Sequence, residues 1–413
     1  MRKEASRDFG KCRACNACQD LIACPGGGLR TGEKCIGCGA CYWVCLHNAI
    51  EMVPADDMGK VSIKVDESFF EVPNGITVLK ALEGLGFHIK DFPDEEEGIY
   101  APCKTGGCWS CALEINGQLL PACFTAIKDG MRIKTASENI IPKRKIGGFF
   151  GHLAGGVGTP WQLKGRDSII ETVCFTVGCN FHCPQCQNWI ITFMSVLDPL
   201  TPNEAAMKMT LARQKNKVDR MTISGGESTL NKSWLIQYLT ELKRLNPEPQ
   251  TRFHVDTNGS ILTKDYIDEL VQAGMTDIGI DLKAHDINTF MKITGLENQK
   301  LAQKYKDVAL KSVKYILEKY PDIFLGIGIP YNRELTSLKE IEIMGQKIAQ
   351  LNPDVQVSAL DYRAEYRRPD LPPPTDQEMR EVHSLLKSTG LKTVICQIRG
   401  NHIGPDGNLI SSS

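Results

Sequence analysis

The stretch CNFHCPQC, residues 179–186, holds three cysteines at the spacing CxxxCxxC. It directly follows ETVCFTV, residues 171–177, an apolar and β-branched run of strand length. Three thiolates can bind three corners of a 4Fe-4S cube and leave one iron without a protein ligand, and such an open position makes a metal site catalytic rather than structural. We therefore expect an open metal site at the end of a strand. A fragment of a zinc site is the alternative for these residues taken alone.

Strand-like and helix-like segments alternate from this stretch to about residue 400. Capping boxes begin at Thr201 and Thr375, and Gly274 and Gly390 follow two of the predicted helices. Repeated alternation predicts parallel strands, and therefore a full or partial α/β barrel or a doubly wound sheet. Both folds place active sites at the carboxyl ends of the strands. The further strand-like runs are 220–224, 252–257, 277–283, 323–329, 355–361 and 392–398.

Glycine-containing and charged motifs end three of these strands. SGGE at 224–227 ends the second strand, DTNG at 256–259 the third and DLK at 281–283 the fourth. Glycines let the backbone approach a ligand closely, and a carboxylate at Glu227 can accept hydrogen bonds from an ammonium group. Polar residues that merely cap strands in loops are the alternative.

Taken together, these motifs resemble the radical S-adenosylmethionine (SAM) superfamily, in which the amino and carboxylate groups of SAM chelate the fourth iron. The resemblance covers about residues 172–400. With CQNW at 186–189, the sequence is most similar to the activase branch, whose best-known member activates pyruvate formate-lyase. The resemblance implies that Cys179, Cys183 and Cys186 bind the catalytic cluster. It also implies SAM contacts from Gly225, Gly226, Glu227, Asp281 and Lys283.

Within this resemblance, Asp281 contacts the ribose of SAM and Lys283 contacts its carboxylate. Asp256, Thr257 and Asp281 are implied to form the small cation site that the branch can carry beside SAM. The sequence departs from familiar activases in two ways. Its additional clusters precede the barrel instead of lying inside it, and ALDYRAEYRRPDLPPP at 359–374 lacks a histidine that some activases have.

Two cysteine runs near the amino-terminal end follow the bacterial two-cluster ferredoxin pattern, CxxCxxC with a fourth cysteine further on. In that pattern the fourth cysteine of each run binds the other 4Fe-4S cluster. The first run has five residues before its last cysteine instead of three, and Leu46 stands in place of the usual proline. Tetrahedral zinc is the alternative. The expected ligands are Cys12, Cys15, Cys18 and Cys45 for one cluster, and Cys35, Cys38, Cys41 and Cys24 for the other.

A third group of cysteines follows CxxxxCxxC with one cysteine downstream, which is the plant-type 2Fe-2S spacing. The surrounding sequence resembles the β-grasp 2Fe-2S domain of iron-only hydrogenases and some complex I subunits. Gly106 and Gly107 suit the tight loop that turns amides toward the sulfurs. A structural zinc site is the alternative. The expected ligands are Cys103, Cys108, Cys111 and Cys123.

The expected fold class is α/β, a partial (β/α) radical SAM barrel preceded by a small two-cluster ferredoxin domain and a β-grasp 2Fe-2S domain. Cys174 and Cys396 are expected to pack inside strands as small hydrophobic residues. The expected parts are a ferredoxin-like domain at 1–58, a 2Fe-2S domain at 59–140, a Gly-rich linker at 141–165, the barrel at 166–400 and a tail at 401–413.

Charge is balanced, with 48 basic and 49 acidic side chains, so no positive excess indicates a nucleic-acid partner. MRKEASRDFG lacks the apolar stretch of a secretory signal, and the apolar stretch 146–163 is broken by six glycines. The 17 cysteines stand at metal-ligand spacings, which suits a reducing compartment. We expect a cytoplasmic protein without a nucleic-acid or membrane partner.

The resemblance implies that one electron enters the open cluster, passes to SAM and breaks its S–C5′ bond, giving a 5′-deoxyadenosyl radical that abstracts hydrogen. The amino-terminal clusters are expected to relay electrons from an external low-potential donor. The expected cofactors are three 4Fe-4S clusters, one 2Fe-2S cluster, SAM and a monovalent cation. The favoured function is activation of a glycyl-radical enzyme. A radical SAM enzyme acting on a small molecule or another protein, and a non-catalytic electron-transfer subunit, are the alternatives.

Overall fold

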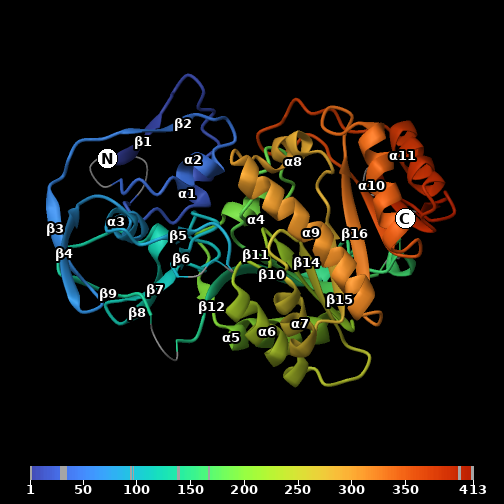
Figure 1. The fold of residues 1–413 in the computed structure, drawn as a ribbon, viewed down its shortest axis with the longest axis horizontal. Helices are drawn as coiled ribbons and strands as arrows, with labels where there is room; N and C mark the ends of the chain where they lie inside the picture. Colours follow the sequence, from blue (N-terminus) through green and yellow to red (C-terminus); the bar gives the residue numbers. More distant parts are fainter. Residues whose placement is uncertain are drawn as a thin grey trace. The chain divides into compact units, whose positions relative to one another are not determined.

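The chain forms two compact units in the computed structural model (Figure 1). The first comprises Met1–Gly147, Thr176–Asn180 and Asn188–Thr201, and the second comprises Gly148–Phe175, Phe181–Gln187 and Pro202–Ser413. The expected barrel limits, residues 166 and 400, lie outside the described residues. The structure describes residues 2–27, 35–93, 95, 97–136, 140–165, 168–398 and 401–410.

The second unit is built on parallel strands that lie side by side in chain order. From β13 to β18, each strand pairs in parallel with the next. A doubly wound sheet reverses its strand order part-way, so this order excludes that alternative and confirms the α/β partial barrel. The strands are β11 (Glu171–Thr176), β13 (Arg220–Gly225), β14 (Arg252–Thr257), β15 (Asp277–Asp281), β16 (Phe324–Tyr331), β17 (Gln356–Asp361) and β18 (Thr393–Ile398).

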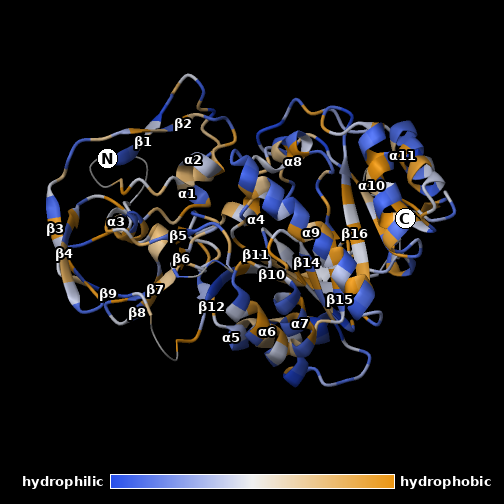
Figure 2. Ribbon diagram, in the orientation of Figure 1, coloured by the Kyte–Doolittle hydropathy of each residue, from blue (hydrophilic) through white to orange (hydrophobic). Residues whose placement is uncertain are grey.

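Helices connect these strands, and Figure 2 shows them with mixed hydrophobic and hydrophilic residues beside largely apolar strands such as β16. The predicted capping box at Thr375 is formed, because its backbone N–H donates to Glu378 at 2.7 Å and its hydroxyl accepts from the Glu378 N–H. Gly274 ends its helix in the left-handed region. The helices are α5 (Pro202–Asn216), α6 (Lys232–Leu245), α7 (Lys264–Ala273), α8 (Ile287–Thr294), α9 (Gln299–Lys319), α10 (Leu338–Leu351) and α11 (Asp376–Ser388).

The stretch 141–165 was expected to be a Gly-rich linker, but it contains regular secondary structure. It contains strand β10 (Arg144–His152) and the short 3-10 turn η3 (Trp161–Leu163). A β-carbon added to Gly158 would lie 2.5 Å from the carbonyl carbon of Ile278, and one added to Gly326 would collide with the Val157 carbonyl oxygen. The glycines therefore serve close backbone packing rather than flexibility. In the described ranges, no helix is long and apolar enough to cross a membrane.

The expected tail at 401–413 also carries structure where it is described. Strand β19 (Asn401–Ile403) pairs antiparallel with β18, and β20 (Leu409–Ile410) pairs antiparallel with β19. The intervening stretch GPDGN supplies the turn, with Gly407 at φ 82°. The tail is therefore corrected to a hairpin that extends the sheet.

The 2Fe-2S region of the first unit is a five-stranded mixed sheet with one helix against it. The strand order is β4-β3-β9-β7-β8, and only the pair β3 and β9 within it is parallel. This arrangement agrees with the expected β-grasp domain. The elements are β3 (Lys60–Val65), β4 (Ser68–Pro73), α3 (Val78–Gly84), β7 (Ala112–Ile115), β8 (Gln118–Pro121), η2 (Ala122–Phe124) and β9 (Met131–Lys134).

The ferredoxin-like region is small, and its two outer strands pair antiparallel with each other. Its core is a cluster of Cys41, Cys45, Ala49 and Ile50, with Cys12 and Cys18 packed against it. Cysteines thus replace much of the apolar core that a region of this size would otherwise need. The remaining elements of the first unit are β1 (Lys3–Arg7), α1 (Ala17–Asp20), α2 (Ala40–Val44), β2 (Ile50–Pro54), β5 (Ile89–Lys90), β6 (Ile99–Tyr100), α4 (Trp189–Phe193) and β12 (Pro199–Leu200).

Candidate iron-sulfur and cofactor sites

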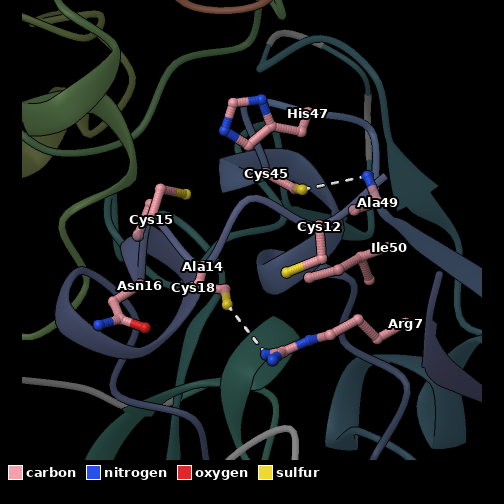
Figure 3. Close-up of a pocket in the computed structure, with 11 residues that line it drawn as sticks. Arg7, Cys12, Ala14, Cys15, Asn16, Cys18, Cys45, His47, Ala49 and Ile50 are labelled. Carbon is pink, nitrogen blue, oxygen red and sulfur yellow. Dashed lines mark hydrogen bonds between the residues drawn. The ribbon is translucent and has the colours of Figure 1, made fainter. Parts of the chain in front are cut away.

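The first group of thiols lines one pocket in the ferredoxin-like region (Figure 3). The Arg7 guanidinium donates to the Cys18 sulfur at 3.5 Å, and the Ala49 N–H donates to the Cys45 sulfur at 3.2 Å. A cation and an amide directed at sulfur stabilise thiolates, as a cluster site requires. The cysteines that line the pocket are those predicted to share the first cluster: Cys12, Cys15, Cys18 and Cys45.

The second group lies around α2 in the same region. Burial, together with the charges of Cys24 and Cys35, raises the pKa of the Cys38 thiol to about 11. Burial also raises the pKa of the Cys41 thiol, and the charges of Cys38, Cys35 and Cys24 act in the same direction. Cys24 therefore lies with the second run, as the crossed ligand pattern requires. Because these pKa values are high, a bound metal is needed to hold the group as thiolates.

The third group is fully enclosed. Cys103, Cys108, Cys111 and Cys123 are each no more than 4% exposed. Hydrogen bonds from the side chains of Cys108 and Cys123 hold the pKa of Cys103 well below its ordinary value. The Cys123 N–H donates to the Cys111 sulfur at 3.5 Å. The four thiols thus lie together in a closed environment, as the ligands of one 2Fe-2S cluster would. All 17 cysteines of the chain are free, so no disulfide competes with ligation.

The triplet follows β11 and differs from these groups in its surroundings. Cys179 belongs to the first unit, while Cys183 and Cys186 belong to the second and are joined by the hydrogen bond from the Cys186 N–H to the Cys183 carbonyl. Burial raises the pKa of the Cys183 thiol to about 12, although the Lys283 ammonium opposes this effect. The structure brings Cys183 close to Cys186 and Lys283, and the grouping of all three thiols stays a prediction.

A charged cluster lies at the carboxyl ends of β15 and β17. The Lys283 ammonium donates to Asp281 Oδ2 at 2.7 Å and to the Tyr362 hydroxyl at 2.9 Å. Burial alone would lower the pKa of Lys283, but Asp281, Tyr362 and Cys183 raise it well above its ordinary value. Lys283 is therefore a permanent cation beside Cys183. Tyr362 was missed from the sequence, although its position directly after β17 is the signal that could have found it.

Glu227 is buried, and hydrogen bonds engage both of its oxygens. Oε1 accepts from the Thr229 N–H at 3.0 Å, the Thr229 hydroxyl at 2.5 Å and the Thr257 hydroxyl at 2.6 Å, and Oε2 accepts from the Asn258 N–H at 2.7 Å. The carboxylate therefore ties the end of β14 to the loop after β13. Gly225 lies at φ 115°, which a residue with a side chain rarely adopts. Contact of Gly225, Gly226 and Glu227 with SAM stays a prediction.

The residues of the expected cation site each have other partners. Asp256 Oδ1 lies 2.9 Å from His254 Nε2 and accepts from the Gly158 N–H at 3.3 Å. Thr257 donates its hydroxyl to Glu227, and Asp281 pairs with Lys283. In the part of the chain that the structure describes, no three His, Cys, Asp or Glu side chains are arranged to hold a single metal ion. The cation site stays a prediction.

Three family profiles match the chain. Residues 173–341 match the radical SAM superfamily, 59–138 a 2Fe-2S iron-sulfur cluster binding domain, and 32–51 a 4Fe-4S binding domain. Residues 173–341 are a radical SAM domain. The chain therefore contains a radical SAM domain, and the segments that match a 2Fe-2S and a 4Fe-4S domain precede it.

Relatives match parts of the chain. A Methanocaldococcus jannaschii protein, provisionally named a glycyl-radical enzyme activating enzyme, is 32% identical over 140 residues, which are 32% of this chain and 49% of that protein. A Streptomyces coelicolor component of NADH-quinone oxidoreductase is 35% identical over 85 residues, 20% of this chain and 9% of that component. The chain thus spans about half the length of the first relative. The solved structure of Streptococcus suis SuiB bound to SAM overlaps 53% of this chain and 46% of its own, with a TM-score of 0.39 and 17% identity.

Proposed function

We propose that this enzyme cleaves SAM reductively to a 5′-deoxyadenosyl radical and uses that radical to activate a glycyl-radical enzyme. The observation that carries the proposal is the cation Lys283 held between Asp281 and Tyr362 beside Cys183. A buried, permanently charged ammonium beside a cluster thiol is suited to bind the carboxylate of a ligand that also reaches the metal. This ligand would occupy the coordination position that three cysteines leave open.

The residues around Lys283 have separable tasks in this proposal. In this proposal Lys283 pairs with the SAM carboxylate, and Asp281, whose side chain is 25% exposed, accepts a hydrogen bond from a ribose hydroxyl. Tyr362 is neutral, but its hydroxyl accepts a hydrogen bond from the Lys283 ammonium and so orients it. The bound cluster and SAM together supply homolysis of the S–C5′ bond, while the protein positions them and excludes water.

The activase assignment is supported by the CQNW and DLK motifs and by the name of the M. jannaschii relative. The partner would then be a protein whose glycine loses a hydrogen atom to the 5′-deoxyadenosyl radical. We propose four clusters in total, one at each group of thiols, with electrons supplied by an external low-potential donor. No nucleic acid or membrane takes part in this proposal.

The first experiment is an anaerobic assay of full-length, iron-reconstituted protein with dithionite and SAM, in which 5′-deoxyadenosine is measured. The proposal predicts product from the unchanged protein and none from Cys183→Ala. Cys396→Ala is the matched control, because Cys396 is a buried strand residue far along the chain from the motif, and this variant should retain activity. Equal product from Cys183→Ala and Cys396→Ala would contradict the proposal.

The activase step is tested separately. The protein, SAM and dithionite are incubated with each glycyl-radical enzyme encoded by the same genome, and the glycyl radical is measured by electron paramagnetic resonance (EPR). One radical formed per 5′-deoxyadenosine supports activation. Cleavage of SAM without a radical on any of these proteins, or a genome without such a protein, would instead favour a different substrate for the same chemistry.

A further inference from the structure

Two glycines bring the 2Fe-2S region against the residue that precedes the SAM-site cysteines, within the first unit. A β-carbon added to Gly178 would lie 2.9 Å from the Cys108 nitrogen and 3.2 Å from the Cys103 sulfur. One added to Gly107 would lie 2.8 Å from the Gly178 nitrogen and would collide with Val177. Neither position tolerates a side chain, so the loop of the third thiol group lies directly on the backbone next to Cys179.

Hydrogen bonds fix this contact from both sides. The Lys145 N–H donates to the Gly107 carbonyl at 3.3 Å, and the Val177 N–H donates to the Lys145 carbonyl at 3.1 Å. Gly178 donates its own N–H to the Thr192 carbonyl at 2.9 Å. The 2Fe-2S loop, the start of β10 and the residues that follow β11 are therefore joined by main-chain bonds, which are insensitive to side-chain motion.

The second ferredoxin-like group approaches the same region less closely. Ala23, beside Cys24, donates its N–H to the Ser195 hydroxyl at 3.1 Å, but Ser195 is nine residues beyond Cys186. The same group contacts the 2Fe-2S domain instead, because the Lys80 ammonium donates to the Gly37 carbonyl at 2.7 Å, between Cys35 and Cys38. The contacts thus run from the second group to the third, and from the third to Gly178, which precedes Cys179.

We propose that the contact of the Cys103–Cys108 loop with Gly178 is the point at which the electron passes to the cysteine triplet. This inference rests on the proposed function and adds the order of the relay. The reduced 2Fe-2S group gives up one electron and becomes oxidised, and the 4Fe-4S group at the triplet takes up that electron. An external low-potential one-electron donor restores the relay, and no atom is transferred in the step.

The test uses full-length reconstituted protein and the magnetic interaction between neighbouring reduced clusters, both of which are paramagnetic. Only the cluster at the triplet should change its EPR signal when SAM is added, which identifies that cluster. Its signal should show spin-spin broadening that is lost in Cys108→Ala and kept in Cys38→Ala. Broadening that is absent in the unchanged protein, or lost in Cys38→Ala and kept in Cys108→Ala, would overturn the order.

A pair of glycine variants tests the contact while keeping every ligand. Gly107→Ala should weaken the broadening and slow reoxidation of the 2Fe-2S group after a pulse of reductant, with its own spectrum unchanged. Gly84→Ala is the matched control, since Gly84 lies in α3 of the same domain with open space around an added β-carbon. If the two variants behave alike, the glycine contact is not the route.

The same samples separate this inference from the proposed function. Dithionite can reduce the triplet's cluster directly from solution, so 5′-deoxyadenosine should still form in Gly107→Ala, which keeps every cluster ligand. If the unchanged protein forms none while the broadening follows the predicted pattern, the relay order stands and the proposed function fails. If product forms and the broadening is unaffected by Cys108→Ala, the function stands and the relay order fails.

Discussion

The third thiol group, in the 2Fe-2S domain, and the triplet at 179–186 both consist of cysteines, but the two sets of cysteines differ in their surroundings. Cys103, Cys108, Cys111 and Cys123 are nearly inaccessible, and their thiols bond to one another, to backbone N–H groups and to a serine hydroxyl. Cys179, Cys183 and Cys186 are partly exposed as residues, although the Cys183 thiol itself is buried, and a lysine, an aspartate and a tyrosine interact with that thiol. A closed group holds a cluster, whereas an open one leaves room for a ligand and provides charges to bind it.

The largest expected effect is the difference in stability and SAM binding between two variants, each of which removes one thiol from one of the two kinds of site. Cys111→Ala should destabilise the 2Fe-2S domain by roughly 5 kcal/mol or more, because cluster binding there also folds the domain. Cys186→Ala should change the stability of the barrel by less than about 1 kcal/mol and abolish SAM binding. Thermal unfolding and SAM titration of both variants measure this contrast. Equal loss of stability in the two variants would remove the distinction.

The next effect concerns Glu227, whose carboxylate ties the end of β14 to the loop after β13. Glu227→Gln should lower the free energy of unfolding by about 2–4 kcal/mol. The amide NH₂ group of glutamine would face N–H and O–H groups that now donate hydrogen bonds to the carboxylate. Chemical denaturation measures it, and Glu297→Gln, at an exposed position, is the control. Unchanged stability together with weakened SAM affinity would instead assign Glu227 a direct ligand contact.

Lys283 tests whether the charge beside the triplet binds the cofactor. Lys283→Met should raise the dissociation constant for SAM by about 10–100-fold, the loss of one hydrogen bond to a charged group. Isothermal titration measures this change, and Lys339→Met, on the exposed surface of α10, provides the control. An affinity within experimental error of the unchanged protein would show that the carboxylate of SAM is bound elsewhere.

Tyr362 gives the smallest expected effect. Tyr362→Phe keeps the ring and removes only the hydroxyl that accepts from Lys283, so the SAM affinity should fall by about three- to tenfold. The charge of Lys283 remains, and the effect should disappear in the Lys283→Met background, as a double-mutant cycle would reveal. Additive losses in the cycle would mean that Tyr362 acts on SAM by itself.

Local patterns in the sequence were enough to place the parallel strands, the capping box at Thr375 and the first three cysteine groups. Strand ends follow from β-branched runs, and the capping box at Thr375 is defined within four residues. Cys45 lies with the first run and Cys24 with the second, as the ferredoxin spacing predicts, and their ligation of the crossed clusters stays a prediction.

Contacts between distant parts of the chain were not predictable in the same way. Tyr362 meets Lys283 across 79 positions, and Glu227 meets Asn258 across 31, so neither role is encoded in a local motif. The glycines of 141–165 suggested a linker because sequence alone does not distinguish flexibility from close backbone packing against Gly279 and Gly326. The tail hairpin was missed because its strands are only two or three residues long.

The most direct test of the open coordination position is a hyperfine measurement on the reduced protein with SAM that carries nitrogen-15 in its amino group. We predict a nitrogen-15 coupling on one cluster, absent in Cys183→Ala and unaffected by Cys108→Ala. That result would mean that SAM occupies the position that the three cysteines leave open. A protein that binds SAM, retains the cluster at the triplet and shows no such coupling would contradict the central claim.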